Sequence, residues 1–370
     1  MNPRSAPVAR SVAARRAALA AVLLAFAPAL APRNAEARQR ARRSRAAAPA
    51  LASGAAGATA PASADYAARP EVHAFIDEMV AQHGFIEAEL QAVFAQAHYS
   101  ADALRLIAPA PPTFKRSWRA YRARFLDAQR IREGLRFWRD NEGWLAYASA
   151  RYGVPPEIVV AIIGVETFYG RITGGFRVID ALSTLAFDYP RRAPYFRGEL
   201  EQYLLYARES GIDPGSLRGS FAGAVGLPQF MPGSIRRYAV DLDGDGRIDL
   251  QSNPADAIGS VASFLALHGW RSGEPVRFQM RFDSEERLAP LVAAGIEPRF
   301  TIGELTGYGI ASVESVAPDL PLALIDLPNA DEPTSYYLGA PNFYVITRYN
   351  RSSFYAMAVY ELSQALAAGR

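Results

Sequence analysis

The stretch from Pro155 to Gly170, which reads PPEIVVAIIGVETFYG, is apolar over most of its length. Its two prolines and Glu157 are typical of a helix start, because proline fits the first turn and an acidic side chain favours the positive end of the helix. Gly170 marks the expected stop. We therefore expect a short helix buried within the fold, with apolar side chains on every face.

Glu166 places a carboxylate within this apolar helix. Helical spacing predicts the neighbours Ile162, Ile163 and Tyr169, and such a setting disfavours the charged form and raises the pKa of the carboxyl group. A carboxylic acid that stays protonated near neutral pH can act as a general acid. The alternative is a structural glutamate neutralised by an arginine, because ion-pair networks also perturb pKa values.

The N-terminus has the pattern of a secretory signal over residues 1–37. Four arginines precede the apolar run Ala17–Leu30, and Ala35-Glu36-Ala37 is a small-residue cleavage site. We expect export to the periplasm, with cleavage near Ala37. A membrane anchor is the alternative, although the run is interrupted at Pro28 and is shorter than the roughly 20 apolar residues of a spanning helix. The chain has no cysteine, so it lacks a lipid-bearing one.

The charge of the folded part is negative, although the whole chain has a formal net charge of +3. Residues 1–45 contribute +9, from ten arginines and one glutamate, and Asp65 contributes −1, so +3 − 9 + 1 leaves −5 from Tyr66 onward. This balance gives no electrostatic support for nucleic-acid binding. Residues 38–65, rich in Arg, Ala and Pro, are expected to form a disordered linker.

Helical periodicity dominates the rest of the chain, which predicts a mainly α (α+β) fold. Residues 66–150 read as a helical lobe, and residues 151–273 with 341–370 read as a central unit. Residues 274–340 change to short strand-like runs separated by turns, which predicts a small inserted β domain. The individual expectations are helices at Tyr195–Arg208, Ala255–Leu267 and Ser353–Leu366, strands at 275–280 and 322–325, and a last strand at Phe343–Thr347.

A glycine-rich loop covers residues 219–232, GSFAGAVGLPQFMP. Three glycines among small residues let the backbone approach a ligand closely, while Ser220 and Gln229 offer hydrogen-bonding groups suited to amides and hydroxyls. A tight connecting loop without a ligand is the other interpretation.

An acidic loop, DLDGDGRID, matches the first nine positions of an EF-hand calcium loop, with Gly246 at the turn. Position 12 is Ser252 instead of the usual glutamate, so we expect Asp256 to supply the closing ligand. A plain acidic turn is the alternative, although alternating carboxylates repel one another without a cation. The predicted ligands of a structural calcium ion are Asp241, Asp243, Asp245, Arg247 through its carbonyl, and Asp256.

Other cofactor chemistries lack support in the sequence. The absence of cysteine and the presence of only four histidines argue against a zinc site or a cysteine nucleophile. Neither a Walker loop nor a G-x-S-x-G elbow is present. We therefore expect no organic cofactor.

Four ordered motifs together resemble the lytic murein transglycosylase B family (glycoside hydrolase family 103) of the lysozyme-like superfamily, over about Arg69 to Leu366. The resemblance implies a lysozyme-like catalytic core with a helical lobe, a small β domain and a calcium-bearing loop. The motifs are Ile163–Thr167, the loop Ser220–Pro232, the acidic loop with 256–260, and Asn342–Asn350.

Carried over by position, the resemblance implies one catalytic acid and base, Glu166. Ser220 would orient the acetamido group of the substrate, Asn350 would help hold the reacting sugar, and Gln229, Tyr349 and Tyr355 would lie in the cleft. Two features depart from the family: the lipid-modified cysteine is missing, and the acidic loop is one residue longer before Asp256.

The activity that the resemblance implies is cleavage of the MurNAc–GlcNAc β-1,4 bond of peptidoglycan with formation of 1,6-anhydro-N-acetylmuramic acid ends. A hydrolytic muramidase and a non-catalytic peptidoglycan-binding scaffold are the alternatives. The expected partners are peptidoglycan glycan strands and cell-wall synthesis proteins, and we expect a monomer.

Overall fold

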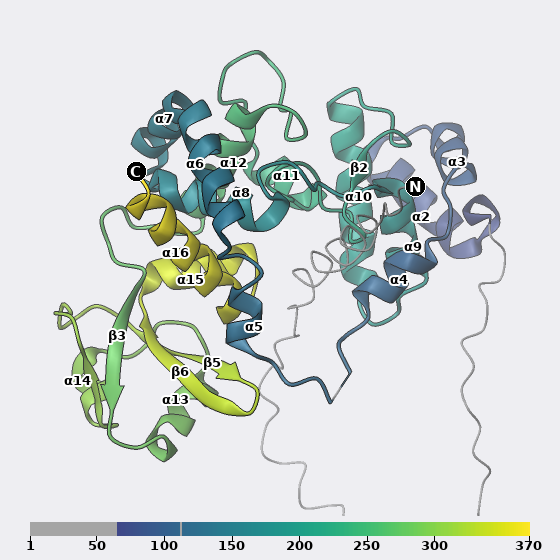
Figure 1. The fold of residues 1–370 in the computed structure, drawn as a ribbon. Helices are drawn as coiled ribbons and strands as arrows, with labels where there is room; N and C mark the ends of the chain where they lie inside the picture. Colours follow the sequence, from purple (N-terminus) through teal and green to yellow (C-terminus); the bar gives the residue numbers. More distant parts are fainter. Residues whose placement is uncertain (1–64, 112) are drawn as a thin grey trace, which may run out of the picture.

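The computed structural model describes residues 65–111 and 113–370. The signal peptide predicted at 1–37 and the linker predicted at 38–65 lie outside these residues, except for Asp65. Helices make up most of the described part and one small sheet stands apart from them (Figure 1). The predicted mainly α fold with a small β part is confirmed.

One group of helices lies around α9 and α10, on the right of Figure 1. The turn η3 packs on α2 and α3, α4 packs on α9, and α9 packs on α10. The bounds are η3 Tyr66–Ala68, α2 Pro70–His83, α3 Glu87–Ala95, α4 Ala101–Ile107, α9 Val178–Phe187 and α10 Ala193–Glu209.

A second group surrounds α8, which contacts α6, α7, α12 and α16. Helix α11 contacts both α10 and α12, so it connects the two groups. The bounds are α5 Trp118–Arg122, α6 Ala128–Asp140, α7 Glu142–Tyr152, α8 Pro156–Thr167, α11 Pro232–Tyr238, α12 Pro254–Leu267, α15 Pro341–Tyr349 and α16 Ser353–Ala368.

The helices of residues 66–150 divide between these groups, because α6 and α7 pack on α8 while α2 and α3 do not. The domain boundaries expected from the sequence therefore stay a prediction. The helices expected at Tyr195–Arg208, Ala255–Leu267 and Ser353–Leu366 are confirmed as α10, α12 and α16.

The small sheet has four antiparallel strands in the order β4-β3-β6-β5. It has its own hydrophobic cluster, which includes Leu291, Leu305 and Leu338. The bounds in this part are β3 Arg277–Phe282, η4 Glu286–Leu288, α13 Ala289–Ala294, α14 Ile302–Thr306, β4 Ile310–Ser312, β5 Ala323–Asn329 and β6 Glu332–Gly339. The strands expected at 275–280 and 322–325 correspond to β3 and β5.

The prediction of a strand at Phe343–Thr347 is wrong, because these residues form part of α15. Pro341 occupies the first turn of this helix, where proline is favoured. Most of the aromatic and β-branched residues that suggested a strand are buried where α15 packs against α12 and α16, namely Phe343, Val345, Ile346 and Thr347. Tertiary packing has overridden a short run of local β preference.

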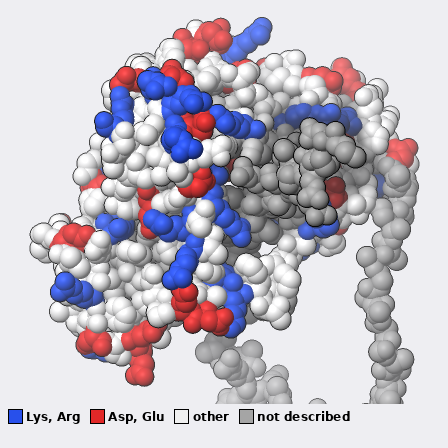
Figure 2. All heavy atoms as spheres, in the orientation of Figure 1, with Lys and Arg blue, Asp and Glu red and all other residues white. Residues whose placement is uncertain are grey.

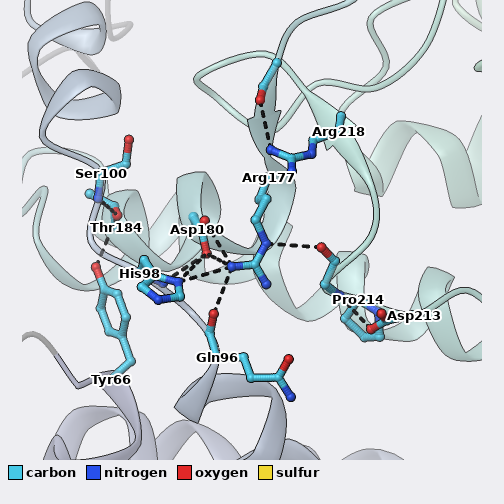
Figure 3. Close-up of polar contacts among 12 residues, drawn as sticks. Tyr66, Gln96, His98, Ser100, Arg177, Asp180, Thr184, Asp213, Pro214 and Arg218 are labelled. Atoms are coloured by element: carbon cyan, nitrogen blue, oxygen red, sulfur yellow. Dashed lines mark hydrogen bonds and ion pairs between the residues drawn. The ribbon is translucent and has the colours of Figure 1, made fainter.

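Arg177 joins the end of α3 to α9 (Figure 3). Its guanidinium donates to the carbonyl oxygen of Gln96 at 2.9 Å and to that of Gly215 at 3.1 Å, and it pairs with Asp180 at 3.2 Å. Arg177 lies on β1 (Phe176–Arg177), which pairs with β2 (Arg218–Gly219), the strand directly before Ser220. The network therefore supports the start of the glycine-rich loop.

No single helix among the described residues is long and apolar enough to cross a membrane. Helices α7 and α8 together reach that length and composition, with a bend of 114° between them.

Candidate active site

Glu166 lies in the last turn of α8, where Ile158 through Thr167 are all buried. The helix ends at Thr167, three residues before the Gly170 stop that the sequence predicts. Phe168 and Tyr169 have left-handed backbones, with φ of 53° and 59°. The predicted neighbour relation of Tyr169 to Glu166 is therefore wrong, since the chain has left the helix before Tyr169.

The Tyr169 ring lies instead where α8 meets α6. A Cβ added at Gly134 of α6 would be 2.3 Å from the Tyr169 hydroxyl, and one added at Gly164 of α8 would be 2.6 Å from it. The absence of side chains at the two glycines thus makes room for this ring at the end of the helix that carries Glu166.

Glu166 is 8% exposed, and among the described residues its carboxyl group has one hydrogen-bond donor, the Tyr355 hydroxyl, at 2.7 Å from Oε1. Burial raises the pKa of Glu166 to about 7, and the hydrogen bond from Tyr355 lowers it in part. None of the ion pairs between described residues involves Glu166. The structure therefore favours a protonatable acid over a glutamate neutralised by an arginine.

Glu166 opens into a cleft with about 510 Å³ of atom-free space, part of it open to solvent. Both groups of helices contribute to the walls, since Ile107 and Tyr195 come from one group and Glu166 and Tyr349 from the other. The lining residues are Ile107, Glu166, Arg192, Tyr195, Phe196, Ala222, Gln229, Met231, Tyr349 and Asn350. Among the described residues, Glu166 is the one carboxylic acid that lines this cleft.

The glycine-rich loop is attached to α8 through Thr167, whose hydroxyl donates to the carbonyl oxygen of Leu227 at 2.9 Å. Gln229 lines the cleft with a left-handed backbone, φ 51°. Its Nε2 donates to the carbonyl oxygens of Thr173 and Gly226, which directs the amide oxygen to act as an acceptor. Ser220 is buried beside the cleft residue Ala222, and its Oγ accepts from the backbone amides of Ala222 and Ala224.

A further part of the cleft wall comes from the end of α15. Tyr349 lines the cleft, donates to the carbonyl oxygen of Pro228 at 2.6 Å and stacks on Tyr355 with 6.4 Å between ring centroids. Asn350, the C-cap of α15, is buried and also lines the cleft. Glu166, Gln229, Tyr349, Asn350 and Tyr355 thus come together although the sequence separates them widely.

Tyr121 of α5 is a site residue that the sequence analysis missed. Burial raises the pKa of Tyr121, and the nearby Glu166 raises it further. Tyr121 also packs against Phe354, the residue before Tyr355, with 5.5 Å between centroids. It lies in a five-residue helix with no motif around it, so no local sequence signal could have identified it. Arg192 and Tyr195 of the cleft were missed for the same reason.

The acidic loop brings three of its five predicted ligands together. One carboxylate oxygen each of Asp241, Asp243 and Asp256 lies within 4.8 Å of the others. Buried Asp256 accepts from the amides of Leu242 and Asp249, which places it beside the loop although it belongs to α12. Asp245 lies outside this group, and its Oδ1 accepts from the amide of Arg247.

A clustered set of carboxylate oxygens is the donor chemistry that calcium prefers. Asp241 also accepts from the amides of Gly244 and Gly246, so it orders the turn in which the cluster sits. The observed group therefore fits a calcium ion.

A helical fold whose cleft has one carboxylic acid among its described lining residues, the buried Glu166, is consistent with the lysozyme-like class of enzymes that cleave glycans. The family model described as "Transglycosylase SLT domain" matches residues 67–364. The chain therefore belongs to the transglycosylase SLT domain family, and it is a lytic transglycosylase; the resemblance noted in the sequence is confirmed.

Individual relatives agree with this family. The chain is 43% identical over 314 residues to the membrane-bound lytic murein transglycosylase B of Escherichia coli (strain K12), covering 83% of this chain and 85% of the relative. It is similar to the solved structure of Escherichia coli Slt35 in complex with calcium, with 43% identity, a TM-score of 0.74, and coverage of 83% and 95%. It is also similar to Pseudomonas aeruginosa SltB3 in complex with NAG-anhNAM-pentapeptide, with 30% identity, a TM-score of 0.70, and coverage of 81% and 80%.

Proposed function

We propose that this enzyme cleaves the MurNAc–GlcNAc β-1,4 bond of peptidoglycan and leaves 1,6-anhydro-N-acetylmuramic acid ends. The observation that carries the proposal is Glu166, whose pKa is raised to about 7 and which is the single carboxylic acid among the described residues that line the cleft. Glycosidases with two carboxylates use one as acid and the other as base or nucleophile. With one carboxylate, we assign the role of nucleophile to a group on the substrate.

In the first step, Glu166 gives its proton to the O4 atom of the leaving GlcNAc. The C1–O4 bond breaks while the acetamido oxygen of the muramyl sugar bonds to C1. We assign the orientation of that acetamido group to Ser220. Asn350 and Gln229 would hold the sugar, because both line the cleft and carry amide groups that match sugar hydroxyls and amides.

In the second step, the Glu166 carboxylate takes the proton of the muramyl C6 hydroxyl. The C6 oxygen attacks C1 and displaces the acetamido oxygen, which closes the 1,6-anhydro ring and restores the protonated acid. No water is consumed. The ligand of the similar SltB3 structure, NAG-anhNAM-pentapeptide, is the kind of product this step would give.

We further propose that the acidic loop holds a structural calcium ion through Asp241, Asp243 and Asp256, with the Arg247 carbonyl and Asp245 as further ligands. The carboxylate cluster and the calcium complex of the similar Slt35 structure support this assignment. A calcium ion there would cancel the repulsion among the clustered carboxylates.

The proposed place of action is the cell envelope, where peptidoglycan lies and where the predicted export signal would direct the chain. The similar protein of Escherichia coli is described as membrane-bound and acts on murein. Soluble periplasmic location, a monomeric state and contacts with cell-wall synthesis proteins stay predictions.

Replacing Glu166 with Gln tests the mechanism, because glutamine keeps the size of the side chain but has no proton to transfer. We expect turnover of isolated cell-wall sacculi to fall about 100-fold or more, with binding to sacculi retained. Mass spectrometry of the wild-type products should show anhydro ends. Reducing muramyl ends would instead establish a hydrolytic muramidase, and sacculi left intact by the wild-type protein would establish a non-catalytic scaffold.

A further inference from the structure

The segment 115–140, which covers α5 and α6, is strongly basic within an otherwise acidic folded part. It contains nine Lys and Arg residues against three Asp and Glu residues, whereas the chain from Tyr66 onward has a net charge of −5. Figure 2 shows Lys and Arg side chains gathered down one face of the molecule, over α6 and α5. A local surplus of positive charge is suited to binding an anionic ligand.

Most of these cations are already paired with carboxylates, namely Lys115, Arg119, Arg122, Arg130, Arg136 and Arg139. The other three, Arg116, Arg124 and Arg132, are exposed and form no ion pair with any residue that the structure describes. These three arginines are the ones whose charge is available to a ligand.

Two of the three lie next to residues that neighbour the catalytic acid or its hydrogen-bond donor. The Arg116 guanidinium carbon lies 4.3 Å from the centroid of the Phe354 ring, and Phe354 directly precedes Tyr355, the hydrogen-bond donor to Glu166. The backbone amide of Arg124 donates to the carbonyl oxygen of Tyr121 at 3.1 Å. Burial and the charge of Glu166 raise the pKa of Tyr121, while Arg124 and Arg116 lower it, so both arginines act on the same partly buried tyrosine. Arg132 is not among the groups that act on Tyr121.

We propose that Arg116 and Arg124 form a cationic shelf beside the cleft, which binds carboxylates of the peptide attached to the muramyl sugar. The proposal rests on the function proposed above and extends it to the choice of substrate. The two sugars of the strand carry amides and hydroxyls but no free charge, so the anionic groups of the substrate lie on its peptide.

The geometry of the substrate and of the guanidinium group fits this role. A five-residue peptide spans at most about 17 Å, so its carboxylates stay within reach of a shelf next to the bond being cleaved. A guanidinium stacked on a ring keeps its N–H groups directed outward, where they can bind a carboxylate through two parallel hydrogen bonds. The shelf therefore favours strands whose peptides carry free carboxylates over strands whose peptide carboxyl groups are amidated.

The test compares kcat/KM on two substrates, peptide-bearing glycan strands with free peptide carboxylates and the same strands after these carboxyl groups are converted to amides. For R116Q/R124Q we expect kcat/KM to fall about fivefold to tenfold on strands with free peptide carboxylates at low salt, and to stay unchanged on the amidated strands. The loss should shrink at high salt, because exposed charges are screened. R132Q is the matched control: it removes one exposed arginine of the same segment and should leave both values unchanged.

An equal loss on both substrates, or no loss on either, would overturn the proposal. Because Arg116 also packs on Phe354, R124Q is measured alone, and it should still lower kcat/KM selectively on strands with free peptide carboxylates. If R116Q/R124Q loses binding to vesicles of anionic phospholipid but keeps its substrate preference, the shelf serves a membrane surface and the proposal is wrong. A wild-type enzyme inactive on both substrates would instead contradict the proposed function itself.

Discussion

At the scale of single residues, the environment of Glu166 determines what the protein can do. A carboxyl group is costly inside an apolar helix, and the cost appears as a pKa raised to about 7 by burial. The hydrogen bond from Tyr355 limits this shift without neutralising it by an opposite charge. The same property that makes the acid able to donate a proton therefore makes its ionised form destabilising.

The free energy of unfolding should accordingly depend on pH through Glu166. Below about pH 4.5 the carboxyl group is protonated in both the folded and the unfolded chain. Between about pH 4.5 and 7 it ionises in the unfolded chain alone, so stability falls as pH rises. The loss approaches about 3 kcal/mol above pH 7, since each pH unit between the two pKa values corresponds to about 1.4 kcal/mol.

Glu166→Gln removes this loss, because glutamine does not ionise. Thermal unfolding should show a Tm advantage of the variant over the wild type that is largest at pH 8 and shrinks toward pH 4.5. Glu89→Gln, which changes an exposed glutamate on α3, is the control and should show no such trend. An advantage independent of pH would mean that burial does not shift the pKa of Glu166.

At the scale of secondary-structure elements, the crossing of α6 and α8 sets the position of the last turn of α8. Gly134→Ala tests it, because the added Cβ would meet the Tyr169 hydroxyl at 2.3 Å. We expect a loss of about 1–3 kcal/mol of stability from overpacking, measured by urea unfolding. Gly143→Ala is the control, since a Cβ there meets nothing within 4 Å. Equal stability of the two variants would show that the ring moves aside easily.

The acidic loop supports the cleft through the glycine-rich loop. The amide of Leu227 donates to the carbonyl oxygen of Leu250 at 2.8 Å, and Gln251 donates to the carbonyl oxygen of Arg218 at 2.7 Å. The residues directly after the acidic loop thus hold the glycine-rich loop at two points, just before Ser220 and two residues before Gln229.

Asp241→Ala should lower Tm and abolish any rise of Tm on adding calcium, because it removes one clustered carboxylate and the acceptor of two turn amides. A chelator should lower the Tm of the wild type in the same way. The exposed Asp319→Ala should leave the calcium response intact. A wild-type melting curve that is identical with calcium and with chelator would contradict the proposed metal site.

At the scale of the whole molecule, the turn between β5 and β6 connects the small sheet to the helical part next to the cleft. The amide of Ala330 donates to the carbonyl oxygen of Arg116 at 2.8 Å, and the amide of Arg119 donates to Asn329 Oδ1 at 2.9 Å. Since α5 packs on α16, this connection reaches the helix that carries Tyr355.

Asn329→Ala should loosen this connection by about 1 kcal/mol, the typical value of one such hydrogen bond. Hydrogen exchange measured by mass spectrometry should become faster in residues 116–122 and stay unchanged in α2, which serves as an internal control. Unchanged exchange in residues 116–122 would show that the remaining contacts hold α5 without Asn329.

The sequence by itself determined the features that depend on near neighbours along the chain. An apolar run with prolines at its start identified the buried helix around Glu166, alternating aspartates identified the acidic loop, and glycines among small residues identified the loop with Ser220 and Gln229. The tertiary structure alone decided which distant groups meet. Tyr355 donates to Glu166 across 189 residues, Tyr121 joins them from an unremarkable short helix, and residues 343–347 became helix by packing between two others. Local patterns are set by the backbone geometry of a few residues, whereas long-range contacts depend on how whole helices fill a shared core, which no single stretch of sequence specifies.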